Sequence, residues 1–233
     1  MIDLHQPAKE GFTLLELLVA IAMTAVLTLA VYGTYRAVSS SAEIYRKTIH
    51  YHEMAMACLE RMSADLQSIA IRSPSEYVSS KDPKKSDPLM IRIHPASPDT
   101  GIPPETTILQ LTSRNSLSLS PSDLPGIVNI RYELIPDETG GWALRRSQSN
   151  VPFSGLPEMQ TEPVVCRELR AIEIVAMDAE GKGLKQWDSN AKEQRYETPA
   201  AVMIRLGVGD GPFRVNVETL VRLPVNRSAK QHS

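Results

Sequence analysis

The sequence is poor in cysteine, in aromatic residues and in excess charge of either sign. Cys58 and Cys166 are the only cysteines among 233 residues, so the chain has no disulfide framework. Lysine plus arginine (25) nearly balance aspartate plus glutamate (27), and no basic patch with interleaved aromatics occurs. The pattern of a nucleic-acid-binding protein is therefore missing. The length allows one ordinary domain plus an extended segment.

Motifs of common enzymes and metal sites are missing too. The chain has no G-x-S-x-G elbow, H-E-x-x-H pair or phosphate-binding loop. Among the five histidines, His50 and His52 lie two positions apart, so they do not face each other on a helix. The acidic stretch from Asp178 to Glu180, with its glycines, is typical of a turn rather than a calcium loop. We therefore expect no catalytic residue, no metal and no cofactor.

Proline is absent between Ala8 and Pro74, which leaves room for one long helix. The 21 residues from Phe12 to Tyr32 are nearly all apolar, and Glu16 is their only charge. About 20 apolar residues span a bilayer as a helix, so the pattern predicts a transmembrane helix over 12–35. A charge inside such a helix costs roughly 2.5–3.5 kcal/mol on insertion scales. Glu16 therefore needs a partner.

A cut directly before the apolar run would supply that partner. The leader MIDLHQPAKEG is short and polar and ends at Gly11. Cleavage after it makes Phe12 the new N-terminus, and Glu16 then lies one helical turn beyond a positively charged amine. In a bundle of identical helices, the amine of one subunit neutralises the Glu16 of its neighbour at only one axial stagger. We interpret Glu16 as a residue for assembly and register.

The stretch Gly11-Phe12-Thr13-Leu14-Leu15-Glu16 resembles the cleavage and methylation signature of type IV pilins and of type II secretion pseudopilins. The resemblance implies that a prepilin peptidase cuts between Gly11 and Phe12 and methylates the new amine of Phe12. It also implies that Glu16 guides subunits into a filament. Members often carry a basic residue before the glycine, whereas this chain has Glu10, which weakens the positive-inside signal of the leader.

Beyond the apolar run, the pattern becomes amphipathic. Gaps of three and four residues separate the larger apolar side chains, as in a helix with one face on a core. These residues are Tyr51, Ala55, Leu59, Met62, Leu66 and Ile69. The opposite, polar face is predicted to carry Glu53, Glu60, Arg61, Asp65 and Gln67. We predict one helix from Phe12 to about Arg72, with 36–72 as its amphipathic part and Gly33 as a local weak point.

The remainder, 73–225, is predicted to form a β-rich domain. A proline-rich, charged connection runs from Ser73 to Pro104, with one short strand possible at Leu89–Ile93. The alternation in IVNIRYEL is typical of a half-buried antiparallel strand, and PDETGG before WALRR predicts a hairpin. LRAIEIVAMD, a turn and a strand through Trp187 predict a second hairpin.

AAVMIRLGV, GDGP and FRVNVETLVRL predict the clearest hairpin near the C-terminus. SNAKEQRYETP is interpreted as a polar loop, and 226–233 as a disordered tail. The predicted fold class is therefore α+β, with a long N-terminal helix packed on an antiparallel β-sheet. The predicted divisions are a leader at 1–11, a membrane or filament-core helix at 12–35, an amphipathic helix at 36–72, the β domain and the tail.

Three segments, LERMSADLQSI, IEIVAMDAEGKGLKQW and TPAAVMIRLGV, resemble minor pseudopilin J of type II secretion. This resemblance implies a subunit of the pseudopilus tip. Its partners would be the I-, K- and H-type minor pseudopilins, the major pseudopilin, the prepilin peptidase and the inner-membrane assembly platform. It also implies a single pass of the inner membrane, a C-terminal domain in the periplasm, and extraction into the pseudopilus. A minor type IV pilin, or an uncleaved membrane-tethered binding or enzymatic module, remains an alternative.

The two cysteines leave a question open. The periplasm permits disulfides, but the sequence cannot place the two α-carbons within the roughly 4.4–6.8 Å that a bridge requires. We expect Cys58 and Cys166 to be two separate buried thiols.

Overall fold

The computed structural model describes residues 13–71, 89–95, 106–117, 126–138, 140–150, 163–191, 193–194, 196–225 and 227. The chain forms two compact units, Met1–Lys47 and Thr48–Ser233. A single α-helix, α1 (Leu14–Gln67), contributes residues to both. In the first unit, the described residues are Thr13 and the first part of this helix.

The second unit is built around an antiparallel sheet, which holds nine strands within the described residues. The strands are β1 (Ile91–Ile93), β2 (Thr106–Ser113), β3 (Val128–Pro136), β4 (Trp142–Asn150), β5 (Val164–Met177), β6 (Gly183–Leu184), β7 (Trp187–Asp188), β8 (Ala201–Val208) and β9 (Val215–Arg222). Their order is β7-β1-β2-β3-β4-β5-β8-β9, and β6 pairs with β5.

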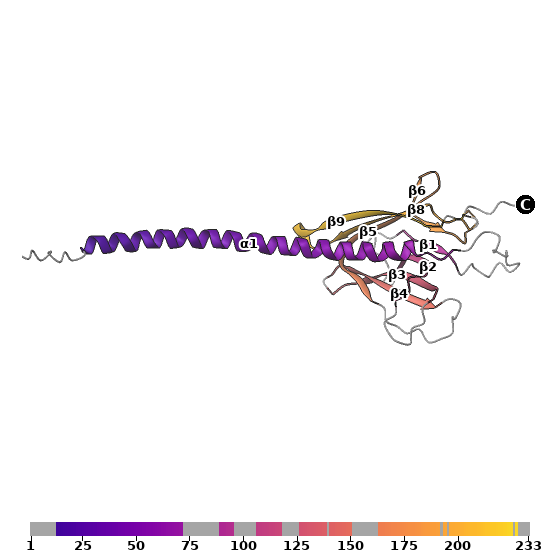
Figure 1. Cartoon of the computed structure of the whole chain (residues 1–233), viewed down its shortest axis with the longest axis horizontal. Helices are drawn as coiled ribbons and strands as arrows, with labels where there is room; N and C mark the ends of the chain where they lie inside the picture. Colours follow the sequence, from indigo (N-terminus) through magenta and orange to yellow (C-terminus); the bar gives the residue numbers. More distant parts are fainter. Residues whose placement is uncertain are drawn as a thin grey trace, which may run out of the picture. The chain divides into compact units, whose positions relative to one another are not determined.

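The sheet curls around the C-terminal part of α1. Figure 1 shows β5, β8 and β9 on one side of this part of the helix and β3 and β4 on the other. A long N-terminal helix thus packs against a curled antiparallel sheet. This α+β, pilin-like arrangement confirms the predicted fold class.

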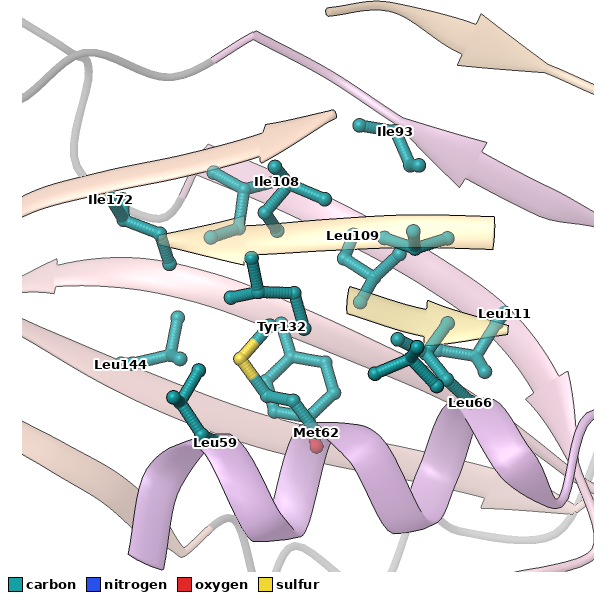
Figure 2. Packing of buried hydrophobic residues seen from close by; sticks show 14 of the residues in the cluster. Leu59, Met62, Leu66, Ile93, Ile108, Leu109, Leu111, Tyr132, Leu144 and Ile172 are labelled. Atoms are coloured by element: carbon teal, nitrogen blue, oxygen red, sulfur yellow. The ribbon is translucent and has the colours of Figure 1, made fainter. Parts of the chain in front are cut away.

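The amphipathic part of α1 buries the predicted apolar face. Tyr51 is half-buried, and the other members of the stripe are buried: Ala55, Leu59, Met62, Leu66 and Ile69. Figure 2 shows Leu59, Met62 and Leu66 pointing from the helix into a cluster that includes Tyr132 and Leu144. Full burial of one such side chain contributes about 1.5–3 kcal/mol. The stripe therefore holds this part of the helix on the sheet.

The helix ends at Gln67, and the prediction that it continues to about Arg72 was wrong. Ile69 leaves the helical path and forms an isolated β-bridge with Ser113, the last residue of β2. The Ser113 hydroxyl donates to the carbonyl of Ser68 at 3.2 Å. The last turn of a helix leaves carbonyl groups without helical partners. Here the end of β2 provides hydrogen bonds to this segment, so the chain turns from helix to sheet.

Asp65 was predicted on the polar face, and this prediction was wrong. Its side chain is fully buried. Its carboxylate accepts hydrogen bonds from Tyr132 Oη at 2.6 Å, from Arg146 Nε at 2.7 Å and from Asn115 Nδ2 at 2.7 Å. A buried charge is tolerated when it is paired and hydrogen-bonded. This is the physical reason that an aspartate can lie on the core side of the helix.

Arg146 completes the polar cluster around Asp65. It is also fully buried, and its two Nη atoms donate to Gln148 Oε1 at 2.8 Å and to the Asn115 carbonyl at 3.0 Å. Burial, followed by the neighbouring Asp65 charge, raises the pKa of the Tyr132 hydroxyl well above its ordinary value. Tyr132 therefore stays protonated and donates. The cluster joins α1, β3, β4 and the segment after β2.

Most of the predicted strands are confirmed. β1, at Ile91–Ile93, lies within the short strand predicted at Leu89–Ile93. The pairs β3–β4, β5–β6 and β8–β9 form hairpins at the predicted turns. In β8, the buried side chains include the alternating residues Val202, Ile204, Leu206 and Val208. Along most of β9, half-buried and exposed residues alternate.

Two features of the sheet differ from the prediction. β2 was not predicted, because its residues are buried over consecutive positions rather than in alternation. The strand at Trp187 is β7, which pairs with β1 instead of closing a hairpin on β5. The backbone N–H of Ser189 donates to the carbonyl of Ile91 at 3.1 Å, and the Ile91 N–H donates back to Ser189 Oγ at 3.1 Å. These two hydrogen bonds attach the end of β7 to β1.

The predicted loop at Ser189–Pro199 contains no strand or helix among its described residues. The predicted tail, 226–233, lies outside the described residues except for Arg227. Arg227 is buried, and its N–H donates to Thr198 Oγ1 at 2.8 Å, so the prediction of disorder was wrong at this position. The proline-rich connection lies outside the described residues over 72–88 and 96–105.

Candidate assembly site at the head of the helix

Two of the three predicted site residues, Gly11 and Phe12, lie outside the described residues. The third, Glu16, lies in the first turn of α1. Its Oε2 accepts hydrogen bonds from the backbone N–H of Thr13 at 3.2 Å and from the Thr13 hydroxyl at 3.1 Å. The Glu16 N–H donates to Thr13 Oγ1 at 3.3 Å. Thr13 and Glu16 thus form a reciprocal pair at the helix start.

This pair is a capping box, in which a threonine at the N-cap and a glutamate three residues later satisfy each other's backbone N–H groups. The first N–H groups of a helix have no helical partner, and leaving them unpaired is costly in an apolar environment. A carboxylate is also favoured at the positive end of the helix dipole. Sequence reasoning missed Thr13, although the spacing T-x-x-E before an apolar run could have revealed it.

From Leu14 to Tyr35, the helix exposes an apolar surface. The large apolar side chains in this range are 43–83% exposed, with Val19 and Leu14 at the two limits. They are Leu14, Leu15, Leu17, Leu18, Val19, Ile21, Met23, Val26, Leu27, Leu29, Val31, Tyr32 and Tyr35. Exposed apolar patches of this size mark a surface for lipid or for partner proteins. The helix is long and apolar enough to cross a membrane.

The spacing of charges matches the thickness of a bilayer. No acidic or basic residue lies between Glu16 and Arg36, and these 20 residues of helix measure about 30 Å at 1.5 Å per residue. The hydrocarbon core of a bilayer is about 30 Å thick. The guanidinium of Arg36 lies 5.8 Å from the ring centre of Tyr32. Tyrosine and arginine in this combination are typical of a membrane–water interface.

Hydroxyl groups within the apolar segment are satisfied by the helix itself. Thr24 Oγ1 donates to the carbonyl of Ala20 at 2.7 Å, and Thr28 Oγ1 donates to the carbonyl of Thr24 at 2.8 Å. Such bonds satisfy the threonine hydroxyls within the helix, because lipid offers them no hydrogen-bond partner. Glu16 is the only charged side chain of the apolar run. The helix is continuous through Gly33, the predicted weak point.

The remaining candidate residues do not come together into a site. His50 and His52 are exposed on α1, and His94 is half-buried after β1. Within the described part of the chain, no three histidine, cysteine, aspartate or glutamate residues lie close enough to hold a metal ion. Cys58 and Cys166 are both buried and free. They are not bridged, as expected, and Cys166 is the neighbouring group that, together with burial, raises the pKa of the Cys58 thiol.

A comparison with protein families matches residues 7–32 to the prokaryotic N-terminal methylation motif. The match includes the end of the leader, Gly11, Phe12 and Glu16. A type IV pilin-like prepilin signal is therefore present. It supports a pilin- or pseudopilin-like, structural protein, and it implies processing by a prepilin peptidase and assembly with other pilins. Together with the exposed apolar helix, the motif fits a membrane-anchored protein. A comparison with curated proteins found no match.

Proposed function

We propose that this protein is a J-like minor pseudopilin of a type II secretion system. In this proposal, it joins other minor pseudopilins in the periplasmic pseudopilus tip that supports protein export across the outer membrane. One observation carries the proposal: the methylation motif stands at the head of a helix whose first part is apolar and exposed and whose second part is buried in a β domain. Such a chain can be held by lipid, then drawn into a bundle of like helices.

The proposed roles of the site residues follow from their positions. The peptidase cleaves after Gly11 and methylates the amine of Phe12, so that a positive charge lies close to the capping box. Thr13 bonds to one oxygen, Oε2, of the Glu16 carboxylate. The other oxygen points to a second role for Glu16, which is to accept the N-terminal amine of a neighbouring subunit. The cap and the register pair are compatible, because a carboxylate accepts about four hydrogen bonds.

The proposed division of the chain follows the same logic. Residues 1–11 are the leader, 12–35 are the membrane and filament-core helix, and 36–72 are the amphipathic segment, whose helix ends at Gln67. Residues 73–225 form the periplasmic domain, and 226–233 are a tail. The uncharged apolar run that ends before Arg36 and the buried apolar side chains from Ala55 onward support this division.

The J-type assignment rests on three segments that pack into one core. LERMSADLQSI contributes the end of α1, IEIVAMDAEGKGLKQW contributes β5 to β7, and TPAAVMIRLGV contributes β8. Most of their buried apolar residues belong to a single cluster. A minor type IV pilin is the nearest alternative, since the methylation motif serves both systems. An uncleaved membrane-tethered module is the second alternative, and it predicts an intact leader.

A surface for partner subunits is available beside α1. A hollow lies between the helix and β9, lined by Met56, Leu59, Glu60, Ser63, Ala64, Gln67, Glu218 and Thr219. β9 is one of the two edge strands in the described sheet order, and its Leu220 is 54% exposed. Apolar patches with polar rims are typical of protein interfaces. We propose that the I- and K-type minor pseudopilins bind on this side, with the H-type subunit linking the tip to the major pseudopilin.

Substitution Gly11→Val is expected to block maturation. The peptidase must accept a residue without a side chain before the cut, and the β-branched valine fills that space. The measurement is the electrophoretic mobility of the protein in membrane fractions, with and without the peptidase. The wild type should run faster only when the peptidase is present, and the variant should run at the precursor position in both. A wild-type protein of identical mobility in both strains would contradict the proposal.

A fragment beginning at Ser40 is expected to be soluble and to bind its partners. It lacks the apolar run up to Tyr35, and the apolar stripe from Ala55 to Leu66 on its remaining helix is covered by the sheet, while Ile44, Tyr45 and Ile49 stay exposed. Gel filtration with the I- and K-type partners should give one shared peak at micromolar concentrations. As a matched test of the hollow, Ala64→Arg should weaken the complex, whereas Glu53→Arg on an exposed part of the helix should not. Separate elution of the unchanged fragment would argue for a minor type IV pilin or a tethered module.

A further inference from the structure

Two cysteines from distant parts of the chain meet in the core of the second unit. Cys58 lies on α1 and Cys166 on β5, and they are 0% and 2% exposed. Both belong to the same hydrophobic cluster. Cys166 is also the neighbouring side chain with the largest influence on the Cys58 thiol. Two buried thiols that are neighbours in one core, each from a different element, are candidates for a covalent cross-link between those elements.

The backbone around Cys166 is irregular. Cys166 pairs with Leu144 of β4, and the register of that ladder shifts on both sides of Leu144. Two residues further along β5, Glu168 has a positive φ of 50°. The opposite ladder, between β5 and β8, shifts register directly after Leu169. Such irregularities bend a strand and change the direction in which its side chains point, so a regular ladder does not fix the direction of the Cys166 side chain.

We propose that Cys58 and Cys166 form an intrachain disulfide in the mature protein, which fastens α1 covalently to β5. This inference rests on the proposed function in one respect, because it requires the domain to lie in an oxidising compartment outside the cytoplasm. Disulfides persist in such compartments. The oxidant is a disulfide-bearing protein or small molecule of that compartment.

The exchange proceeds through a mixed disulfide. The thiolate of one cysteine attacks a sulfur of the oxidant's disulfide, and one thiolate of the oxidant leaves. The thiolate of the other cysteine then attacks the mixed disulfide, forms the Cys58–Cys166 bond and releases the second thiolate. The two cysteines lose two electrons to the oxidant. Their two protons are taken up, through solvent, by the two departing thiolates, so the oxidant leaves as a dithiol or as two thiols.

The bond forms before the core closes. Contact with Cys166 and burial raise the pKa of the Cys58 thiol well above its ordinary value, so this thiol is unreactive in the folded domain. Exchange therefore takes place during folding, while the chain is still accessible. Afterwards the helix cannot be separated from the sheet when a subunit is drawn out of the membrane. Because the closed loop is long, reduction should lower the melting temperature by roughly 5–15 °C.

The test uses the full-length protein from cells quenched with acid and then dissolved in denaturant. A maleimide-linked polymer labels free thiols, with or without prior reduction. We expect no labelling before reduction and two labels afterwards. A digest should contain one peptide that joins Cys58 to Cys166, lighter by two hydrogens than the sum of the separate peptides. The variants Cys58→Ser and Cys166→Ser, each with one thiol left, should label without reduction.

Two results overturn the cross-link: labelling of both wild-type thiols without reduction, or disulfides that join separate chains. The N-terminal peptide in the same digest separates this outcome from a failure of the proposed function. A methylated Phe12 start together with free thiols refutes the cross-link and leaves the proposed function intact. A Met1 start together with the joined peptide supports the cross-link and refutes the processing.

Discussion

Replacing Asp65 with alanine is expected to lower the free energy of unfolding of the β domain by about 3–5 kcal/mol, since it leaves the buried Arg146 charge without its partner. The loss is large against a typical total stability of about 5–15 kcal/mol. Urea unfolding of the fragment beginning at Ser40 measures it. The matched control is Glu60→Ala, because Glu60 is exposed on the same helix and should change stability by no more than about 0.5 kcal/mol.

Two further variants separate the buried charge from its hydrogen bonds. Tyr132→Phe removes one hydrogen bond to the Asp65 carboxylate and should cost about 1.5–3 kcal/mol. The double variant Asp65→Leu with Arg146→Met removes both charges, and replacing a buried ion pair with apolar residues is often neutral or stabilising. It should therefore recover most of the loss caused by Asp65→Ala. Equal stabilities of Asp65→Ala and Glu60→Ala would show that the cluster does not hold the helix on the sheet.

Replacing Glu16 with glutamine is expected to abolish assembly while leaving cleavage and membrane insertion intact. Glutamine can also serve at the third position of a capping box, so the start of the helix is kept and only the charge is lost. An apolar run without a charge inserts more easily. The amine of the neighbouring subunit then lacks its partner, and breaking such a buried pair costs about 3–5 kcal/mol, less where headgroups and water reach it.

The structure supplies a control that separates the two roles of Glu16. Thr13→Val removes the hydroxyl that takes part in the capping box but keeps the carboxylate. It should leave secretion near the wild-type level, whereas Glu16→Gln should lose secretion and crosslinking to neighbouring subunits. The measurements are crosslinking and a secretion assay in strains that express only the variant. Wild-type assembly by Glu16→Gln, or an equal loss by Thr13→Val, would mean that Glu16 acts as a cap alone.

Features that depend on local periodicity could be predicted from the sequence. The stripe from Ala55 to Leu66 follows the helical repeat, and the apolar residues of Val128–Leu134 follow the strand repeat. The apolar side chains predicted to face the core in each segment are buried. The methylation motif is equally local, since its residues are neighbours in the chain. The capping box of Thr13 and Glu16 is also local, because the spacing T-x-x-E before an apolar run is enough to predict it.

Features that depend on contacts between distant residues could not be predicted. Asp65 and Arg146 are 81 positions apart in the sequence. A charged residue considered without its partner is predicted to lie on the surface. The end of α1 is set by the bridge between Ile69 and Ser113, which only the assembled sheet provides. The contact between the two cysteines likewise arises from the packing of α1 on β5. Sequence periodicity assigns a residue to a face, but the partner across that face decides whether a charge can be buried.

The mass of the N-terminal peptide of the mature protein shows whether this chain is processed as a prepilin, with cleavage after Gly11 and methylation of Phe12. The protein is isolated from membranes of cells that contain the prepilin peptidase, and its N-terminal peptide is sequenced by mass spectrometry. We predict a chain that begins at Phe12, carries one methyl group on its amine and lacks the leader MIDLHQPAKEG. A chain that still begins at Met1, in cells where other prepilins are processed, would contradict prepilin processing and support an uncleaved membrane-tethered protein.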